Sequence, residues 1–547
     1  MLEIEVSKAG AATAVLRGMY LHSRYDPRVE AERFVQETLR DTQPSLVLLL
    51  GAGLGYLIEA LHRKAPAARI IPVYYDRCIY AQAASRVSGG SGPSSPTAEA
   101  LQRAWQPDSG VTLLEHLRAE ISELECEGLA ILEWSVSARL FPELSRDANR
   151  AVRQLLRELR GSLVTTEALG PLWLRNAFRN FVFLEDRFLV PRAIETPICI
   201  AASGPSLEEA LPLIASYRDR FRLWALPSSL LALKTAGVSP DLVVLTDPGY
   251  YAIAHVHPAA NLQLALAMPL TAACGAWRVG ASVIPLSQGT FFERALCDLR
   301  MLHPLALPSY GTVAASALEL ARRLGAREVL FAGLDLIHRD LRSHARPNVF
   351  DQFMSDGVHR LSPFHHRLFA RQTALAGEYG EAGGNDDRPR LSSPALDTYA
   401  GWFAGLGTSF GPALLRLLPT EVALPSFRSL SPGEFRTYAL ALPRVSAPTP
   451  SRRAGTAPST VVERIAQAGR LLSEWAEELA GASRRPEEIL ARPVLTFLCY
   501  YTDAAALAEA LRLKRLAGMR EAASRLRKLA SAGIVLLESI RSHLGGT

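Results

Sequence analysis

Short apolar runs, each followed by a turn of small residues and then by a segment with helical spacing, recur along much of the chain. Residues 46–50 and 198–201 are continuous apolar runs, and the turns 51–55 and 203–206 follow them. Such runs are typical of strands that are buried on both faces of a parallel sheet. Because parallel strands need a crossover between them, usually a helix, the alternation predicts an α/β fold.

The pattern changes near the end of the chain, where apolar residues keep the spacing of helices. The two sets are Val462, Ile465, Leu472, Trp475 and Leu479, and then Leu526, Leu529, Leu536, Ile540 and Leu544. Apolar residues three or four positions apart share one helical face. We therefore expect an all-helical C-terminal domain.

Two features divide the chain into domains. Pro191 interrupts an apolar run just before the central strand, and residues 446–459, SAPTPSRRAGTAPS, have the composition of a linker. We expect a Rossmann-like N-terminal domain over residues 1–190 and a central Rossmann-like domain over 191–445. The linker over 446–459 then leads to the helical domain over 460–547.

The first glycine-rich turn, Gly51 to Gly55, has the spacing G-x-G-x-G between two predicted strands, and the second strand ends at Asp76. This β–α–β layout with an acidic strand end is typical of a dinucleotide or S-adenosylmethionine pocket. A Rossmann-like domain with a vestigial pocket is the alternative, since nothing else nearby looks catalytic.

The second turn, Ser203-Gly204-Pro205-Ser206, joins the central strand to a helix for which Ser206 is a plausible N-cap. A helix N-terminus offers free N–H groups and the positive end of a dipole, where a phosphate or a sugar carboxylate binds well. The alternative is that Gly and Ser serve only the geometry of the turn.

Other polar residues follow predicted strands of the central domain. Asp247 ends the apolar run 242–245, and Asp335 follows the strand 328–332, with His338 and His344 a few residues later. Asp247 suits a ribose hydroxyl, a metal or an acceptor hydroxyl, or it merely forms the turn. A histidine near a carboxylate can act as a general base, although a loop histidine can equally be a surface residue.

Composition and charge exclude several classes of protein. The net charge is +6 from 60 Lys and Arg against 54 Asp and Glu, and no basic run is interleaved with aromatic residues, so we expect no nucleic-acid partner. The six cysteines are far apart, which predicts neither a zinc site nor a disulfide framework. With no signal peptide or membrane span evident, we expect a cytoplasmic protein.

Four motifs of the central domain occur in an order that resembles a known family. They are Ala202–Leu207, Thr235–Asp241 with Asp247-Pro248, Gly311–Ala314 and Gly333–Leu336. Together they resemble the motility-associated factor (Maf) family of flagellin glycosyltransferases, whose MptE-like central domain is similar to bacterial sialyltransferases. Leu21–Pro27, the Gly51–Gly55 turn, and Trp173–Asn176 with Asn180 extend the resemblance to most of residues 20–430.

The resemblance implies transfer of a nonulosonic acid, pseudaminic or legionaminic, from a CMP-activated donor to Ser or Thr of flagellin. It implies that His338 or His344 deprotonates the acceptor, with Asp335 on the far wall of the pocket. The implied donor-binding residues are Ser203, Gly204, Pro205, Ser206, Ser228, Asp247, Ser309, Gly311 and Thr312. No cofactor is required, and a divalent metal is optional because helix N-termini can neutralise phosphate.

Two departures from the family pattern bear on this expectation. Leu334 stands where members commonly carry Gln, and residues 417–425 lack a Gly-rich acidic sequence. The central domain also resembles an archaeal hydroxymethylpterin diphosphokinase, which transfers diphosphate from ATP. A non-catalytic scaffold that binds flagellin is a third alternative.

Overall fold

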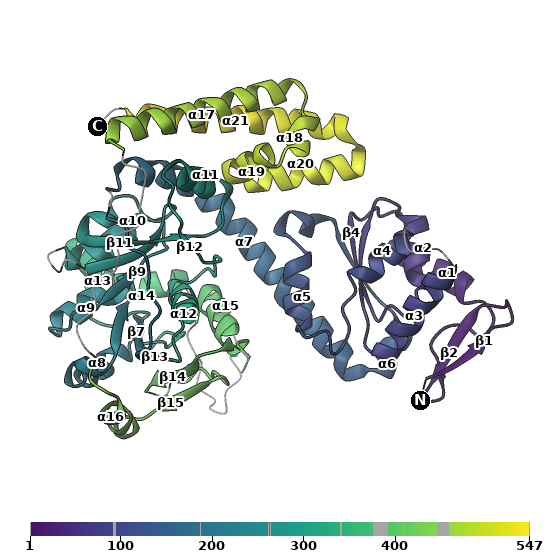
Figure 1. The fold of residues 1–547 in the computed structure, drawn as a ribbon, viewed down its shortest axis with the longest axis horizontal. Helices are drawn as coiled ribbons and strands as arrows, with labels where there is room; N and C mark the ends of the chain where they lie inside the picture. Colours follow the sequence, from purple (N-terminus) through teal and green to yellow (C-terminus); the bar gives the residue numbers. More distant parts are fainter. Residues whose placement is uncertain are drawn as a thin grey trace. The chain divides into compact units, whose positions relative to one another are not determined.

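The computed structural model describes residues 2–90, 95–185, 187–260, 262, 264–339, 342–375, 392–407, 410–418, 420–445 and 459–545 (Figure 1). Contacts divide the chain into two compact units, one of Met1–Gly170 with Glu478–Gly533 and one of Pro171–Glu477 with Ile534–Thr547. This grouping differs from the boundaries at 190 and 445 expected from the sequence, because the long helices α7 (Pro142–Phe183), α17 (Val461–Arg484) and α21 (Met519–Leu544) belong to both units. The predicted linker lies outside the described residues except for Ser459.

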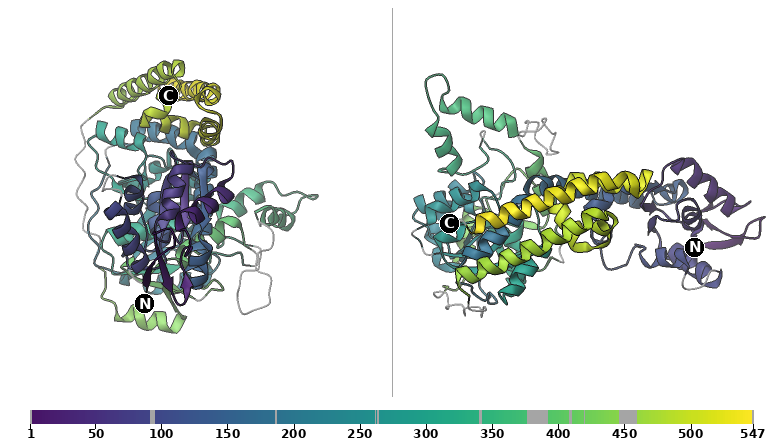
Figure 2. Two further views of the ribbon diagram at one scale, coloured as in Figure 1. Left: turned by 90° about the vertical axis from the view of Figure 1, so that its right-hand side faces the viewer. Right: turned by 90° about the horizontal axis from the view of Figure 1, so that it is seen from above.

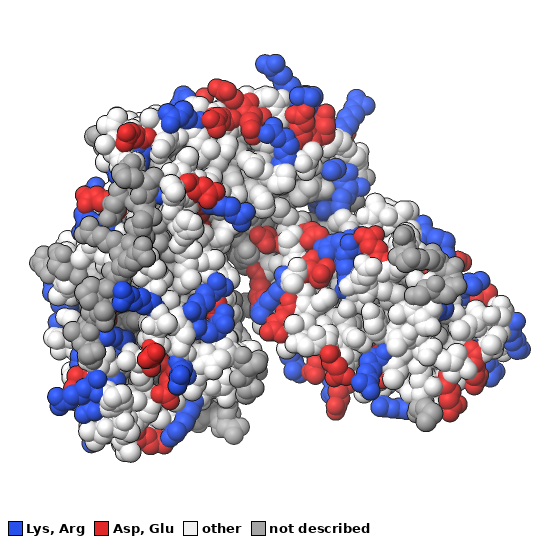
Figure 3. All heavy atoms as spheres, viewed as in Figure 1, with Lys and Arg blue, Asp and Glu red and all other residues white. Residues whose placement is uncertain are grey.

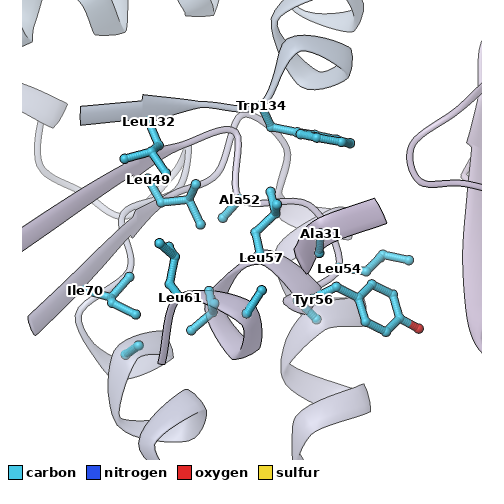
Figure 4. Close-up of a cluster of buried hydrophobic side chains, with 14 of the residues drawn as sticks. Ala31, Leu49, Ala52, Leu54, Tyr56, Leu57, Leu61, Ile70, Leu132 and Trp134 are labelled. Carbon is cyan, nitrogen blue, oxygen red and sulfur yellow. The ribbon is translucent and has the colours of Figure 1, made fainter. Parts of the chain in front are cut away.

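The first unit contains a parallel sheet of Rossmann-like β–α–β construction. Its strand order is β5-β4-β6, with β4 at Leu46–Leu50, β5 at Arg69–Val73 and β6 at Leu129–Glu133. Its helices are α1 (Pro27–Leu39), α2 (Tyr56–Lys64), α3 (Arg77–Gly90), α4 (Pro96–Gln102), α5 (Leu113–Glu120) and α6 (Ser135–Leu140). Leu49, Leu57 and Leu61 pack with Trp134 in the core between sheet and helices (Figure 4).

An antiparallel ribbon and a group of helices complete the first unit. The ribbon is β1 (Glu3–Val6), β2 (Ala12–Leu16) and β3 (Met19–Tyr20). The helices are α18 (Glu487–Ala491), α19 (Pro493–Thr502) and α20 (Ala504–Ala517), together with parts of α7, α17 and α21. The helical C-terminal region expected from the apolar spacing is confirmed.

The second unit is built on a nine-stranded sheet of described residues in the order β12-β11-β10-β9-β8-β7-β13-β14-β15, with every neighbouring pair parallel. The strands are β7 (Ile198–Ala201), β8 (Arg222–Ala225), β9 (Leu242–Val244), β10 (Leu264–Pro269), β11 (Gly280–Ser287), β12 (Leu305–Ala306), β13 (Glu328–Ala332), β14 (Ala413–Leu417) and β15 (Phe427–Leu430). The α/β class is therefore confirmed.

Helices follow most of these strands. They are α8 (Leu207–Ser216), α9 (Leu230–Thr235), α10 (Tyr250–Val256), α11 (Phe291–Leu299), α12 (Val313–Arg323), α13 (Val349–Asp356), α14 (Phe364–Leu375), α15 (Pro394–Ala404) and α16 (Pro432–Ala441). The green segment that carries α13 and α14 stands out from the sheet in both views of Figure 2.

The order of the strands reverses between β7 and β13. From β7 the chain adds β8 to β12 on one side, and it then returns to place β13 to β15 on the other side. In parallel sheets, ligands bind outside the carboxyl ends of the strands at such a reversal. The loops after Ala201 and Ala332 are therefore the candidate place for a ligand in this fold.

Two properties of the described chain concern membranes and nucleic acids as partners. Within the described chain, no helix combines the length and apolarity that a membrane crossing needs. On the face drawn in Figure 3, Lys and Arg are interspersed with Asp and Glu, so the described part of this face carries no continuous basic stripe of the kind that follows a nucleic-acid backbone.

Candidate functional site at the carboxyl edge of the large sheet

The loops after β7 and β13 meet at the reversal of strand order. Ala202 donates its backbone N–H to Ala332 O at 2.8 Å, and Gly204 donates to Gly333 O at 2.8 Å. The loop after β13 then returns, and Ala345 donates to Ser203 O at 2.7 Å. The Ser203–Ser206 turn is thus fixed by main-chain contacts to the loop after β13.

Asp335 and Ser206 form the central side-chain contact of these loops. Ser206 donates its backbone N–H to Asp335 Oδ2 at 2.7 Å and its hydroxyl to Oδ1. Asp335 is 3% exposed, and burial raises the pKa of its carboxyl, although Ser206 and the charges of Arg339 and Arg416 act in the opposite direction. The carboxylate therefore lies at the N-terminus of α8, where the sequence suggested a phosphate.

Close packing explains the glycines of both loops. A Cβ on Gly204 would lie 2.6 Å from Gly333 O and 2.7 Å from Asp335 Oδ2. Gly333 has φ +73°, and a Cβ there would lie 2.8 Å from Ala202 O. Leu334 is buried in the core, so the position that differs from the family pattern has a packing role here.

The remaining predicted donor residues also follow carboxyl ends of strands in this sheet. Ser228 follows β8, and Asp247 follows β9 and accepts the Gly249 N–H at 2.7 Å. Ser309, Gly311 and Thr312 lie between β12 and α12. Because the strands are parallel, all of these residues share one edge of the sheet. Their assignment to donor binding stays a prediction.

Tyr399 of α15 is a residue of this edge that sequence reasoning missed. A Cβ on Gly311 would lie 3.9 Å from its ring. Burial, and next the negative charge of Asp247, raise the pKa of the Tyr399 hydroxyl. Tyr399 therefore lies near two of the predicted donor residues, and only its position just before Trp402 and Phe403 in an aromatic-rich helix could have drawn attention to it.

Two histidines stack beside this edge. His344 stacks on His255 of α10 with ring centroids 6.4 Å apart and planes 19° apart, and Phe350 of α13 packs against both rings at 5.3 and 4.9 Å. Burial lowers the pKa of each imidazole to about 4, and the charge of Asp247 acts on His255 in the opposite direction. Both imidazoles are therefore neutral at pH 7.

The predicted catalytic residues do not all come together. His344 Nδ1 lies 2.8 Å from Ser343 Oγ, whereas Asp335 is engaged by Ser206. His338 is buried, at 8% exposure. His255 was missed from the sequence, where its one signal is that it lies on the helix that follows Asp247. The catalytic assignment of His338, His344 and Asp335 stays a prediction.

His344 lines a small cavity formed by the segment after β13. Its lining residues are Arg342, Ser343, His344, Asn348, Phe350, Asp351, Met354, Leu368 and Arg371. The Arg371 guanidinium lies over the Phe350 ring, 3.8 Å from its centroid. This cavity combines cations, amide and hydroxyl groups with an aromatic face, a composition suited to a polar organic ligand.

Helix α7 fixes the loops after β9 and β10 through two buried asparagines. The Asn176 amide donates to Pro248 O at 3.0 Å and to Thr271 O at 3.2 Å. The Asn180 amide donates to Leu270 O and Ala272 O, both at 2.8 Å. These contacts explain the asparagines of the Trp173–Asn180 motif as supports of the loop that carries Asp247.

The glycine-rich turn of the first unit is occupied by its own chain. Leu54 donates its N–H to His22 Nε2 at 3.0 Å, and a Cβ on Gly51 would lie 2.5 Å from Ser137 Cβ. Asp76 accepts the N–H groups of Cys78 and Ile79 at 2.7 and 3.0 Å, so its carboxylate serves the first turn of α3. This geometry favours the vestigial pocket over a nucleotide or S-adenosylmethionine site.

Metal ligands do not cluster in the described residues, where no group of three or more His, Cys, Asp and Glu side chains is placed to hold a metal ion.

Comparison with known proteins places this site in context. The sequence model of the family described as 6-hydroxymethylpterin diphosphokinase MptE-like matches residues 173–340. An uncharacterized protein of Treponema pallidum (strain Nichols) is 28% identical over 322 residues, which are 57% of this chain and 65% of that protein. A second uncharacterized protein of the same organism is 29% identical over 177 residues, 30% of this chain and 45% of that protein. The chain thus spans less than two thirds of the length of these curated relatives.

Among solved structures, the chain is similar to the Maf glycosyltransferase of Magnetospirillum magneticum AMB-1. The TM-score is 0.55 at 15% identity, and the match covers 100% of this chain and 93% of that one. The chain therefore shares the fold of a Maf glycosyltransferase and carries an MptE-like segment at residues 173–340, so the resemblance seen in the sequence is confirmed at the level of the fold.

Proposed function

We propose that the chain is a glycosyltransferase that moves a nonulosonic acid, pseudaminic or legionaminic, from a CMP-activated donor to Ser or Thr hydroxyls of flagellin in the cytoplasm. The observation that carries the proposal is the common position of the donor residues inferred from the sequence. They follow four strands of one parallel sheet, β7, β8, β9 and β12, and Asp335 follows β13, which pairs with β7 at the reversal of strand order. The fold shared with a Maf glycosyltransferase supports the reaction class.

The donor would lie along the carboxyl edge of the sheet. In this proposal, Ser203 and Ser228 provide hydroxyl groups for the CMP moiety, and Asp247 accepts from a ribose hydroxyl. The turn before α12, with Ser309, Gly311 and Thr312, faces the sugar carboxylate or the phosphate. Asp335 acts as a positioning residue, because its carboxylate is already engaged by Ser206.

The transfer step requires one base and one leaving group. The acceptor oxygen forms a bond to the anomeric carbon as the bond from that carbon to the CMP phosphate oxygen breaks, and CMP leaves with the electron pair. The hydroxyl proton passes to a neutral imidazole, for which His344 and His338 are the candidates. Burial keeps His344 neutral at pH 7, so its ring has a lone pair for this proton. This chemistry requires no resident cofactor.

Mass spectrometry of the acceptor tests the proposal directly. Flagellin from cells with the gene should be heavier than flagellin from cells without it by one or more nonulosonic acids. When the restored gene carries His344→Ala, the rate of flagellin modification should fall about a hundred- to ten-thousandfold. The exposed His303 provides a control, and His303→Ala should restore the normal mass. Unmodified flagellin that still co-purifies with the wild-type chain would favour the scaffold alternative.

A second candidate function is the transfer of diphosphate from ATP to a hydroxymethylpterin. The match of residues 173–340 to the MptE-like family favours it. Purified chain incubated with ATP and 6-hydroxymethylpterin would then release AMP and form the pterin diphosphate. Formation of this product without any transfer from a CMP-sugar would replace the glycosyltransferase proposal.

A further inference from the structure

The stacked histidines belong to a cluster that four segments build. Tyr251 and His255 come from α10, His344 from the loop after β13, and Phe350 from α13. Arg371 of α14 completes it, with its guanidinium against the ring of Phe350. Tyr251 packs on Phe350 with ring centroids 5.2 Å apart. The cluster therefore combines two imidazoles and a guanidinium with an aromatic face.

Two polar groups of this cluster lack partners among the described residues. His255 is 7% exposed and its Nδ1 atom makes no hydrogen bond. Arg371 has neither an ion pair nor a hydrogen bond within the described chain, and burial lowers the pKa of its guanidinium, although Tyr251 and Asp351 act in the opposite direction. Neighbouring arginines are paired, since Arg342 binds Glu208 at 2.7 Å and Arg346 binds Asp351 at 2.8 Å.

An unpaired cation that is partly removed from water is stabilised by an anion with hydrogen-bond acceptors. We propose that Arg371 and His255 form a subsite for the anionic group of the ligand, a carboxylate or a phosphate, with Phe350 and Tyr251 as its aromatic wall. The inference rests on the proposed function, because it takes the ligand to be a CMP-activated acidic sugar.

The charged groups around the cluster are of both signs, and two of them are the carboxylates Asp247 and Asp351. The charged and titratable groups that act on the two imidazoles are Asp247, Arg371 and His338. Asp351, the carboxylate of the cavity lining, is engaged by Arg346. Arg371 therefore has its positive charge available to a ligand, and its ring contact holds the planar guanidinium in one orientation.

Calorimetric titration with CMP-N-acetylneuraminic acid tests the subsite. Arg371→Gln should weaken binding about ten- to a hundredfold, the loss expected for hydrogen bonds to a charged group. His255→Asn should weaken it about two- to tenfold. Arg360 is exposed on the same segment, and Arg360→Gln, which removes an equal charge, should change binding less than twofold. Equal affinities of wild type, Arg371→Gln and Arg360→Gln would overturn the inference.

Simpler probes identify the anionic group. If the subsite takes the sugar carboxylate, Arg371→Gln weakens the binding of N-acetylneuraminic acid and leaves the binding of CMP unchanged. If the subsite takes the phosphate, the variant weakens the binding of CMP and leaves that of N-acetylneuraminic acid unchanged. Arg371→Lys keeps the charge but loses the planar fork, so an intermediate affinity is expected. Unchanged thermal unfolding of the variants shows that the loss is local. If wild type binds ATP but neither CMP nor the CMP-sugar, the proposed function fails, and the same variants titrated with ATP still test the subsite.

Discussion

Asp335 accepts two hydrogen bonds from Ser206, one from the backbone N–H at 2.7 Å and one from the hydroxyl. The two residues follow β13 and β7, the strands that meet where the order of the sheet reverses. A negative charge at a helix N-terminus is favourable because it faces free N–H groups and the positive end of the helix dipole. The contact therefore joins the two halves of the sheet at the edge where the donor is proposed to bind.

A double-mutant cycle should measure this link. Ser206→Ala should lower the free energy of unfolding of the second unit by about 1 kcal/mol, because one hydrogen bond is lost. Asp335→Asn should lower it by about 1–2 kcal/mol, because the amide keeps one acceptor but loses the charge. The loss of stability in the double variant should be smaller than the sum of the two single losses by about 1 kcal/mol. Urea unfolding of the four proteins gives the values, and simple additivity would show that the contact contributes nothing.

Gly204 should not tolerate even a methyl group. In Gly204→Ala the new Cβ would lie 2.6 Å from Gly333 O, so the two loops must separate, at a cost of about 1–3 kcal/mol. Gly401, on the exposed face of α15, has nothing within 4 Å of its Cβ position. Gly401→Ala should therefore stabilise the chain by about 0.5–1 kcal/mol. Thermal unfolding of both variants checks the sign, and equal effects would contradict the packing argument.

Local patterns predicted the strands of this fold well, because buried parallel strands are continuous apolar runs. Ile198–Ala201 and Leu46–Leu50 are both fully buried, as their composition indicated. The order of strands was not predictable, since nothing near Ile198 indicates that Glu328–Ala332 pairs with it. Helix α7 likewise belongs to both compact units, which no local signal in its sequence records.

The candidate site was likewise only partly predictable from local sequence. The turns around Gly204 and Gly53 have similar local signatures, because a strand–turn–helix needs glycine whether its N–H groups bind a ligand or the protein. Only the fold shows that Asp335 and His22 occupy N–H groups of these turns. His255 was missed because the ring on which it stacks, that of His344, lies far along the chain.

Acid should destabilise the second unit through its two stacked histidines. Burial lowers the pKa of His255 and of His344 from 6.5 to about 4. Between these values the unfolded chain binds more protons than the folded one, so stability is complete above pH 6.5 and falls as the pH drops toward 4. The loss is on the order of 3 kcal/mol for each histidine.

Unfolding of the double variant His255→Asn/His344→Asn at several pH values tests this dependence of stability on pH. Its free energy of unfolding should vary less with pH between 6.5 and 4 than that of the wild type. His22 and His62 of the first unit also have lowered pKa values, so the comparison rests on the difference between the two proteins. The control His303→Asn, at an exposed position, should keep the wild-type slope. An unchanged slope in the double variant would rule out these histidines as its source.

The glycine-rich turn of the first unit should bind neither S-adenosylmethionine nor a dinucleotide, because His22 already accepts the Leu54 N–H at 3.0 Å. A Cβ on Gly53 would overlap the His22 ring, whereas Gly10 has nothing within 4 Å of its Cβ position. Both glycines have positive φ, +63° and +75°, so both alanine variants carry similar backbone strain. Gly53→Ala should therefore cost about 1–3 kcal/mol more than Gly10→Ala. Calorimetry should detect no S-adenosylmethionine binding to the full chain, and micromolar binding that Gly53→Ala abolishes would establish a ligand site at this turn.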